Sequence, residues 1–196
     1  MAGFEAIDGA TPIEDLSDLI PTHITNRREL NEWETANILE AAKKYLLRKK
    51  KVNINVEFIK KAHHEMFCQT WKWAGKFRQS NYNIGVDWHN IQEELKKLVD
   101  DVDFWQNQEK GLDVFAQSVR LHHRLVLIHP FVNGNGRHAR LVSDIFLFSR
   151  NHKMPIWPSK ELLEETDIRQ KYIDALKVAD KGDYGPLEKF TKGRMK

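Results

Sequence analysis

Apolar residues recur at helical spacing along most of this chain. The first stripe lies in residues 26–50, ends in a basic turn that suits a helix C-terminus, and comprises Leu30, Trp33, Ala36, Ile38, Leu39 and Ala42. The second lies in residues 56–70 and comprises Phe58, Ile59, Ala62, Met66 and Phe67. Further helices are predicted over residues 91–107, 112–128, 137–149 and 160–179. The pattern therefore predicts an all-α fold.

Three stretches break the helical pattern. Residues 1–24 carry scattered acids with glycine and proline, which predicts an arm with at most a short helix. Residues 71–90, WKWAGKFRQSNYNIGVDWHN, predict irregular chain with a short β-hairpin near residues 82–88. GDYGPL precedes a short terminal turn. We divide the chain into an N-terminal arm (1–24), an N-terminal helix (25–54) and a core domain (55–196).

The segment HPFVNGNGRHAR, residues 129–140, separates two apolar helical runs, and we call it the motif segment. Its glycines and Asn135 tolerate positive φ, which lets successive backbone N–H groups converge where the next helix begins, near Arg137. A helix dipole favours an anion at that point. Arg137 and Arg140 add two planar sets of donors that suit phosphate oxygens. These features predict a polyphosphate-binding site.

His129 begins the motif segment. Pro130 disfavours helical dihedral angles at His129, so the preceding helix should end there. A histidine beside bound phosphates can act as a general base, because its ordinary pKa lies near working pH. The alternative is a structural corner between two helices, with one capping glycine and two solvated arginines.

Composition narrows the classes of function. The net charge of +3 on 196 residues favours an anionic ligand but is too small for a protein that coats nucleic acid. The basic run KKYLLRKKK (43–51) is typical of a solvated helix end, so we expect no nucleic-acid partner. Cys68 is the single cysteine, which excludes an internal disulfide. No stretch is apolar enough for a membrane helix and the N-terminus is acidic, so a cytoplasmic protein is expected.

The motif segment resembles the signature of the Fic (Fido) family, H-P-F-x-[D/E]-G-N-[G/K]-R, extended by x-x-R. Eight of its nine positions match in HPFVNGNGR, and Arg140 supplies the extension. WAGKFR (73–78) and NYNIGV (81–86) resemble the family's substrate flap, and DKGDYGPLEKF its C-terminal end. The long first helix also resembles the subgroup called mobile mystery protein B. The resemblance covers roughly residues 55–190.

The resemblance implies a Fic fold, a helical bundle with a small β-hairpin flap. It implies transfer of AMP from ATP to a Ser, Thr or Tyr hydroxyl of a target protein, with Mg²⁺. The resemblance assigns roles as follows: His129 as base, Phe131 as the anchor of the loop, Gly134, Asn135 and Gly136 as the anion hole, Arg137 and Arg140 as phosphate ligands, and Asn83, Ile84, Gly85 and Val86 as the target flap. A toxin-like or regulatory role with a partner gene product is implied as well, and a homodimer is compatible with the sequence.

One position departs from the signature. Asn133 stands where the family has the acid that binds magnesium, and an amide oxygen brings no charge to a metal that favours carboxylates and phosphates. A modest transferase is our first interpretation. The alternative is a degenerate domain that binds nucleotide without catalysis and acts as a regulatory module.

Glu29 has two interpretations. Thr25 to Glu29 fit the spacing of the family's inhibitory helix, in which a glutamate pairs with the second motif arginine. Asn26 and Glu29 also resemble a capping box at the start of the first helix. The two roles are not exclusive.

Other side chains carry weaker signals. His63, His64, His122 and His123 are interpreted as half-buried or surface helix residues, since no zinc-ligand pattern accompanies them. Trp71 and Trp73 are interpreted as packing residues.

Overall fold

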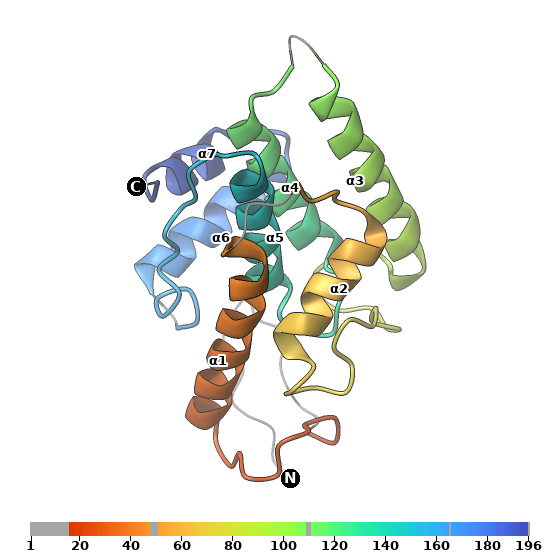
Figure 1. The fold of residues 1–196 in the computed structure, drawn as a ribbon, viewed down its shortest axis with the longest axis vertical. Coiled ribbons are helices and arrows are strands. Elements are labelled where there is room, and N and C mark those ends of the chain that lie inside the picture. The colour runs from red at the N-terminus through yellow and green to blue at the C-terminus, as the bar shows by residue number, and fades with distance from the viewer. Residues whose placement is uncertain (1–15, 48–50, 109–110, 165, 196) are drawn as a thin grey trace.

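The computed structural model describes residues 16–47, 51–108, 111–164 and 166–195. Within these ranges the chain forms seven α-helices and one short 3-10 helix (Figure 1): α1 Arg27–Leu46, α2 Val56–Phe67, η1 Trp88–Asn90, α3 Ile91–Gln106, α4 Val114–Ile128, α5 Asn135–Ser149, α6 Asp167–Ala179 and α7 Gly185–Lys192. The described residues pair only in three isolated β-bridges, so the all-α prediction is confirmed. Most of the arm, residues 1–15, lies outside the described ranges.

Side-chain caps decide where several helices begin. Asn26, Asn55, Asp113 and Thr166 each accept a hydrogen bond from the backbone N–H three residues later, which satisfies an N–H that the helix leaves without a partner. Thr166 therefore starts α6 at Asp167, seven residues after the predicted start. The predicted terminal turn is the eight-residue helix α7, which begins inside GDYGPL.

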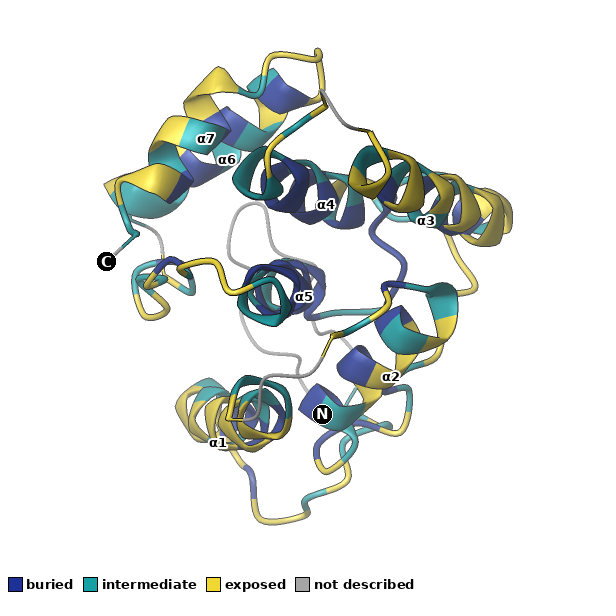
Figure 2. Cartoon of the chain, turned by 45° about the horizontal axis from the view of Figure 1, so that its top comes forward, coloured by how far each residue is buried: buried dark blue, intermediate teal, exposed yellow. Residues whose placement is uncertain are grey.

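Helix α5 lies at the centre of the fold. Figure 2 shows α5 almost end-on, with α4 beside it and α1 and α2 on its other side. Ten of its 15 residues are buried. Helix α3 packs against α4, and α6 and α7 form a pair that contacts α4 from both helices. Because α4 and α5 are consecutive and central, the turn between them is held from several sides.

The buried face of α1 differs from the predicted stripe. Leu30, Glu34, Asn37 and Ala41 are buried, whereas Leu39 is 55% exposed. Glu34 and Asn37 are polar, and apolar periodicity cannot find such a face. Asn37 donates to the hydroxyl of Thr70 (3.0 Å), which satisfies a buried amide. Of the predicted stripe, Leu30 is buried and Trp33, Ile38 and Ala42 are half-buried against the core, whereas Ala36 and Leu39 are exposed. The stripe prediction was therefore right in part, and it missed the two buried polar positions.

Candidate active site

His129 lies at the turn between the two central helices. It ends α4, as the following proline led us to expect, and it adopts the left-handed conformation, with φ 52° and ψ 58°. Its side chain is nearly buried, at 7% exposure. Burial, and then the nearby charge of Arg78, lower the pKa of His129 to about 4. The imidazole is therefore neutral at physiological pH, which is the form a general base requires.

The loop after His129 is closed by its own side chains. Asn135 Oδ1 accepts from the Phe131 N–H (3.0 Å) and Asn135 Nδ2 donates to the Phe131 carbonyl (2.9 Å). Phe131 is fully buried, which agrees with its expected anchoring role. Gly134 has φ +76°, and a Cβ there would lie 2.5 Å from the ring of Phe67. Both the conformation and the close approach require glycine at this position.

The start of α5 supplies the expected converging amides. The N–H groups of Asn135, Gly136 and Arg137 precede the first intrahelical bond, from the His138 N–H to the Gly134 carbonyl (2.9 Å). The helix begins two residues earlier than predicted, and in this motif only Gly134 among the three anion-hole residues has positive φ. A Cβ on Gly136 would meet only Arg140 Nη1, at 3.7 Å. Among the described residues, no side chain therefore crowds Gly136, and its lack of a side chain leaves this part of the helix end open to a ligand.

The two motif arginines have different neighbours. Arg137 forms an ion pair with Glu34 of α1 (Nη1 to Oε2, 2.5 Å) and lies over the ring of Phe67. Arg140 is 8% exposed, and its guanidinium faces the rings of Trp157 and Tyr172. Glu34, which is 2% exposed, was not singled out from the sequence, since it lies 103 residues from Arg137.

Asn133 turns its side chain onto the loop. Its Oδ1 accepts from the Gly134 N–H (2.6 Å) and lies 3.4 Å from Arg137 Nη2. A neutral oxygen beside a guanidinium is a poor ligand for a hard cation. Among the described residues, no three His, Cys, Asp or Glu side chains gather as a metal site. The residues present therefore do not fit a magnesium ion held mainly by the protein.

The flap is not a hairpin. Residues 81–87 form turns and extended chain without strand pairing, so the β-hairpin prediction was wrong. Arg78, 1% exposed, holds this segment instead. Its guanidinium donates to the carbonyls of His129 (2.7 Å), Ser80 (2.7 Å) and Val86. The buried guanidinium of Arg78 therefore fixes the shape of the segment. The pattern of apolar residues in the sequence does not reveal this role of Arg78.

The flap lies directly against His129. Gly85 has φ +97°, and a Cβ there would lie 2.7 Å from the Cβ of His129 and 2.8 Å from Arg78 Nη2. The Val86 N–H also donates to the Ile128 carbonyl (3.4 Å). Asn83 and Ile84 are exposed at the tip of the segment. The structure thus brings Gly85 and Val86 of the expected flap next to His129 and the end of α4.

Glu29 caps α1. The N–H and hydroxyl of Thr25 both donate to Glu29 Oε2, at 2.7 and 3.0 Å, and the Glu29 N–H donates to Asn26 Oδ1 (3.0 Å). These hydrogen bonds lower the pKa of the exposed Glu29 carboxyl, the backbone bond from Thr25 most of all. The carboxylate that contacts a motif arginine is that of Glu34. The inhibitory role of Glu29 stays a prediction.

The other singled-out histidines are structural. His63, His122 and His123 are buried rather than half-buried or on the surface, and only His64 is exposed. His122 hydrogen-bonds Tyr172 (2.7 Å) and His123 hydrogen-bonds Asp180 (2.9 Å), so both tie α4 to α6 and its end.

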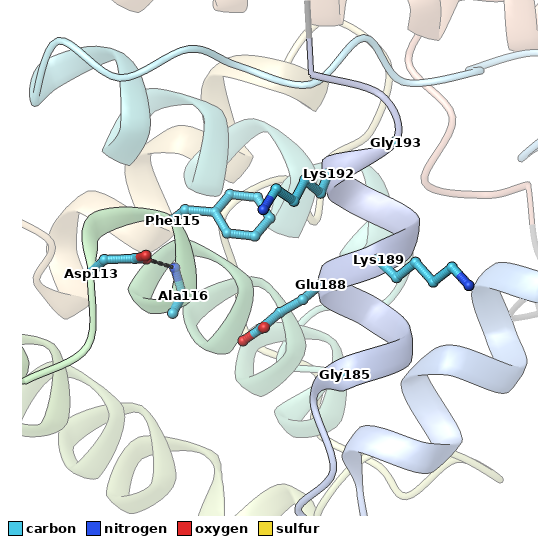
Figure 3. A pocket seen from close by; sticks show the side chains of 8 residues that line it. All are labelled: Asp113, Phe115, Ala116, Gly185, Glu188, Lys189, Lys192 and Gly193. Carbon is cyan, nitrogen blue, oxygen red and sulfur yellow. Dashed lines mark hydrogen bonds between the residues drawn. The ribbon is translucent and has the colours of Figure 1, made fainter.

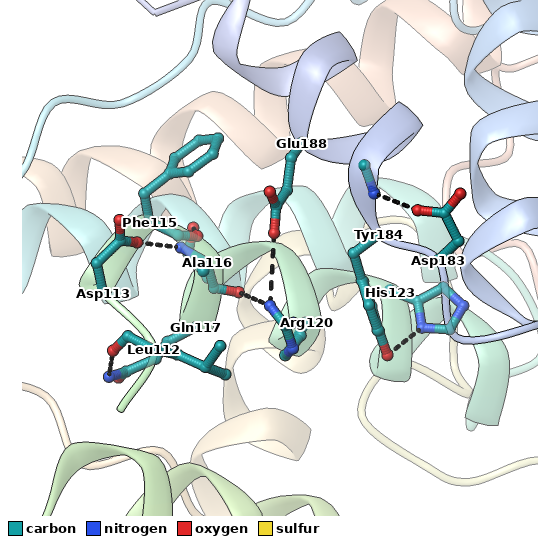
Figure 4. Close-up of polar contacts among 12 residues, drawn as sticks. Leu112, Asp113, Phe115, Ala116, Gln117, Arg120, His123, Asp183, Tyr184 and Glu188 are labelled. Carbon is teal, nitrogen blue, oxygen red and sulfur yellow. Dashed lines mark hydrogen bonds and ion pairs between the residues drawn. The ribbon is translucent and has the colours of Figure 1, made fainter. Parts of the chain in front are cut away.

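A hollow of about 540 Å³ lies away from the motif segment, between the start of α4 and α7 (Figure 3). Asp113 and Glu188 line it with Lys189 and Lys192, and Asp113 is already engaged in capping α4. Figure 4 shows Arg120 joining the two helices through Glu188 (3.5 Å). Helix α4 has 15 residues, so the hollow lies about 22 Å along the helix from His129. It therefore belongs to the contact between α4 and α7.

None of the described helices has the length and apolar character needed to span a bilayer.

Comparison with known proteins agrees with this geometry. The Fic/DOC family profile matches residues 53–147. Protein adenylyltransferase fic-1 of Caenorhabditis elegans is 32% identical over 124 residues, covering 60% of this chain and 22% of that protein. Protein adenylyltransferase Fic of Drosophila melanogaster is 31% identical over 119 residues, covering 60% and 23%. The chain thus spans less than a quarter of the length of these curated relatives.

Solved structures agree on the fold. Fic-1 of C. elegans superposes with a TM-score of 0.68 at 25% identity, covering 90% of this chain and 51% of that one. The N-terminal FIC domain of Bep8 from Bartonella sp. 1-1C superposes with a TM-score of 0.70 at 19% identity, covering 94% and 92%. BepC from Bartonella tribocorum, solved with bound AMPPNP, gives 0.65 at 19% identity, covering 88% and 89%. Residues 53–147 of this chain therefore match the Fic/DOC family profile, and the solved structures share its fold.

Proposed function

We propose that this chain is a protein adenylyltransferase that moves AMP from ATP to a Ser, Thr or Tyr hydroxyl of another protein. The observation that carries the proposal is the pairing of a neutral, nearly buried His129 with the open N-terminus of α5 in one short turn. The relatives named protein adenylyltransferase support it, and so does the similar fold solved with AMPPNP.

The proposed reaction uses the residues as follows. The amides at Asn135 and Gly136 bind phosphate oxygens with the help of the α5 dipole. Arg137 and Arg140 neutralise the outer phosphates. His129 removes the proton of the target hydroxyl, whose oxygen attacks the α-phosphorus. The bond from the α-phosphorus to the bridging oxygen breaks and pyrophosphate leaves, while the proton stays on His129 until solvent removes it.

The flap holds the target in this proposal. Backbone groups near Asn83 and Ile84 would align an extended segment of the target beside His129, as main-chain pairing does in other peptide complexes. The N-terminal helix (25–54) is proposed to regulate the core domain (55–196), since Glu34 from this helix reaches Arg137. We assign no protein residue as a ligand of Mg²⁺.

Labelled nucleotide tests the proposal. The protein is incubated with ATP labelled at the α- or the γ-phosphate, with Mg²⁺ or Mn²⁺, with and without cell lysate. We expect protein-bound label from α-labelled ATP only, and its loss in His129→Ala. Label from the γ-position, or α-label that survives His129→Ala, would contradict the proposal. Binding of ATP without any transfer would favour the non-catalytic alternative that Asn133 raised.

A further inference from the structure

His63 of α2 touches the motif segment from outside it. The side chain has no exposed surface. Its Nδ1 accepts a hydrogen bond from the Gly75 N–H (3.0 Å), and its Nε2 lies 3.0 Å from the Asn133 carbonyl oxygen. One imidazole thus joins the turn that leads into the flap to the loop that leads into α5.

The two contacts select one protonation state. A backbone N–H can only donate and a carbonyl oxygen can only accept, so Nδ1 must carry no proton and Nε2 must carry one. Only the neutral ring with the proton on Nε2 makes both hydrogen bonds. Burial lowers the pKa of His63 well below its ordinary value, and the neighbouring His138, Arg137 and His64 lower it further.

The ring is also fixed in its plane. It stacks on Phe131 with ring centroids 3.7 Å apart and planes 12° apart. His138 packs edge-on against it at 5.6 Å, and His138 is itself bonded to the Ile59 carbonyl (2.9 Å). The imidazole therefore has little freedom to turn away from the Asn133 carbonyl.

The Asn133 carbonyl belongs to the peptide that directly precedes the amides of the phosphate site. A peptide group is planar, so fixing the carbonyl of Asn133 fixes the direction of the Gly134 N–H in the same plane. That plane leads directly into the first turn of α5. On its other side, His63 holds Gly75, three residues before Arg78, whose guanidinium holds the His129 carbonyl.

We propose that His63 is a positioning residue: its neutral Nε2–H orients the Asn133–Gly134 peptide so that the N-terminus of α5 receives the triphosphate. The proposal rests on the proposed function for the identity of the ligand. The geometry itself does not depend on that identity.

Two substitutions separate the two nitrogens of the ring. His63→Gln can place an amide donor near the position of Nε2, and His63→Asn can place only a group near that of Nδ1. We expect His63→Gln to keep the KM for ATP within about twofold of the wild type. We expect His63→Asn to raise that KM about fivefold to tenfold, because one hydrogen bond is lost. The change in kcat should be smaller. His64→Gln is the control, because His64 bonds the Ala74 carbonyl of the same turn (3.1 Å) and lies outside the site.

The KM values are compared only between variants of equal thermal stability. A KM difference between the Gln and Asn variants at equal thermal stability supports the proposal, and equal KM values in two folded variants overturn it. Nitrogen-15 NMR of the wild-type imidazole tests it without any variant or nucleotide. A proton on Nε2 of His63 is expected, and a proton on Nδ1 or a charged ring overturns the proposal. Failure of the wild type to use ATP would contradict the proposed function. The NMR result would still decide the role of His63.

Discussion

The carboxylate of Glu34 is paired with Arg137, the arginine that is proposed to bind a nucleotide phosphate. Its ion pair with Arg137 leaves that guanidinium partly neutralised, and its second oxygen accepts from Trp71 Nε1 (2.7 Å). Any nucleotide phosphate must therefore share or displace this carboxylate. The sequence did not reveal this contact, since the glutamate that it singled out, Glu29, was expected to pair with the second motif arginine and not with Arg137.

Replacing Glu34 by glutamine should tighten nucleotide binding. The substitution keeps the size of the side chain and an acceptor for Trp71, but removes the charge that competes with phosphate. We expect the Kd for ATP, measured by calorimetry, to fall several-fold in Glu34→Gln. Glu29→Gln is the matched control, since its carboxylate reaches Thr25, and its ATP affinity should not change. The opposite order of the two variants would support the predicted inhibitory role of Glu29 and contradict that of Glu34.

The lowered pKa of His129 should appear in the pH profile of transfer. A base with a pKa of about 4 is fully neutral from pH 5.5 upwards, whereas an ordinary histidine would lose about tenfold of its neutral form between pH 7.5 and 5.5. We expect log kcat/KM to show no fall assignable to His129 in this range. A tenfold fall of kcat/KM between pH 7.5 and pH 5.5 would contradict the lowered pKa of His129.

At the scale of elements, the position of the flap depends on the close approach of Gly85 to His129 and Arg78. Gly85→Ala would push a Cβ into His129 and Arg78 and would strain a residue at φ +97°. We expect transfer to the target to fall at least about tenfold, as a small displacement at a reacting group can cost. The Kd for ATP should stay within about twofold, because Gly85 lies outside the phosphate site.

Gly182→Ala controls for backbone strain alone. Gly182 has φ +91°, and in the described part of the chain no atom beyond its own neighbours lies within 4 Å of an added Cβ. The variant should lose a little stability and keep its transfer rate in the labelled-ATP assay. Equal losses of transfer in the two alanine variants would show that the effect comes from general destabilisation and not from the flap.

Helical periodicity located the elements but not all their faces or neighbours. Apolar spacing found α2 to α5 to within a few residues, because their buried faces are mainly apolar. It also found α1, but it missed the buried Glu34 and Asn37, which face polar partners. It also predicted a hairpin where Arg78 organises the chain through three carbonyls.

For the whole molecule, buried neutral histidines should make the fold sensitive to mild acid. Burial lowers the pKa of His63, of His122 (to about 3), of His129 and of His138 (both to about 4). Unfolded chains bind these protons near pH 6.5, so stability is lost as pH falls from about 7 towards 4, by up to about 1.4 kcal/mol per pH unit for each group. Burial raises the pKa of Asp144 to about 8, and this single carboxyl acts in the opposite direction.

Urea unfolding at two pH values checks the balance. We expect the midpoint at pH 5.5 to lie below that at pH 7.5, since four histidines outweigh one carboxyl. His64→Gln removes an exposed histidine and should leave the difference unchanged. A midpoint that is equal or higher at pH 5.5 would contradict the assignment of these histidines as neutral and buried.

The candidate site was predictable where it is contiguous. Residues 129–140 carry the base, the turn and both arginines within 12 positions, and a single signature finds them. Glu34 and His63 reach the same segment across 103 and 70 residues, so only the folded chain shows their roles. Arg78 belongs with them, because its contacts to His129 and Val86 are with backbone carbonyls that any residue could present.

The most direct test of the account is a crystal structure of the protein with a non-hydrolysable ATP analogue. We predict its phosphates against the backbone N–H groups of Asn135 and Gly136, Arg140 beside the terminal phosphate, and the α-phosphorus facing the His129 side chain. Nucleotide bound elsewhere, for example in the hollow between α4 and α7, with the start of α5 empty, would contradict the account.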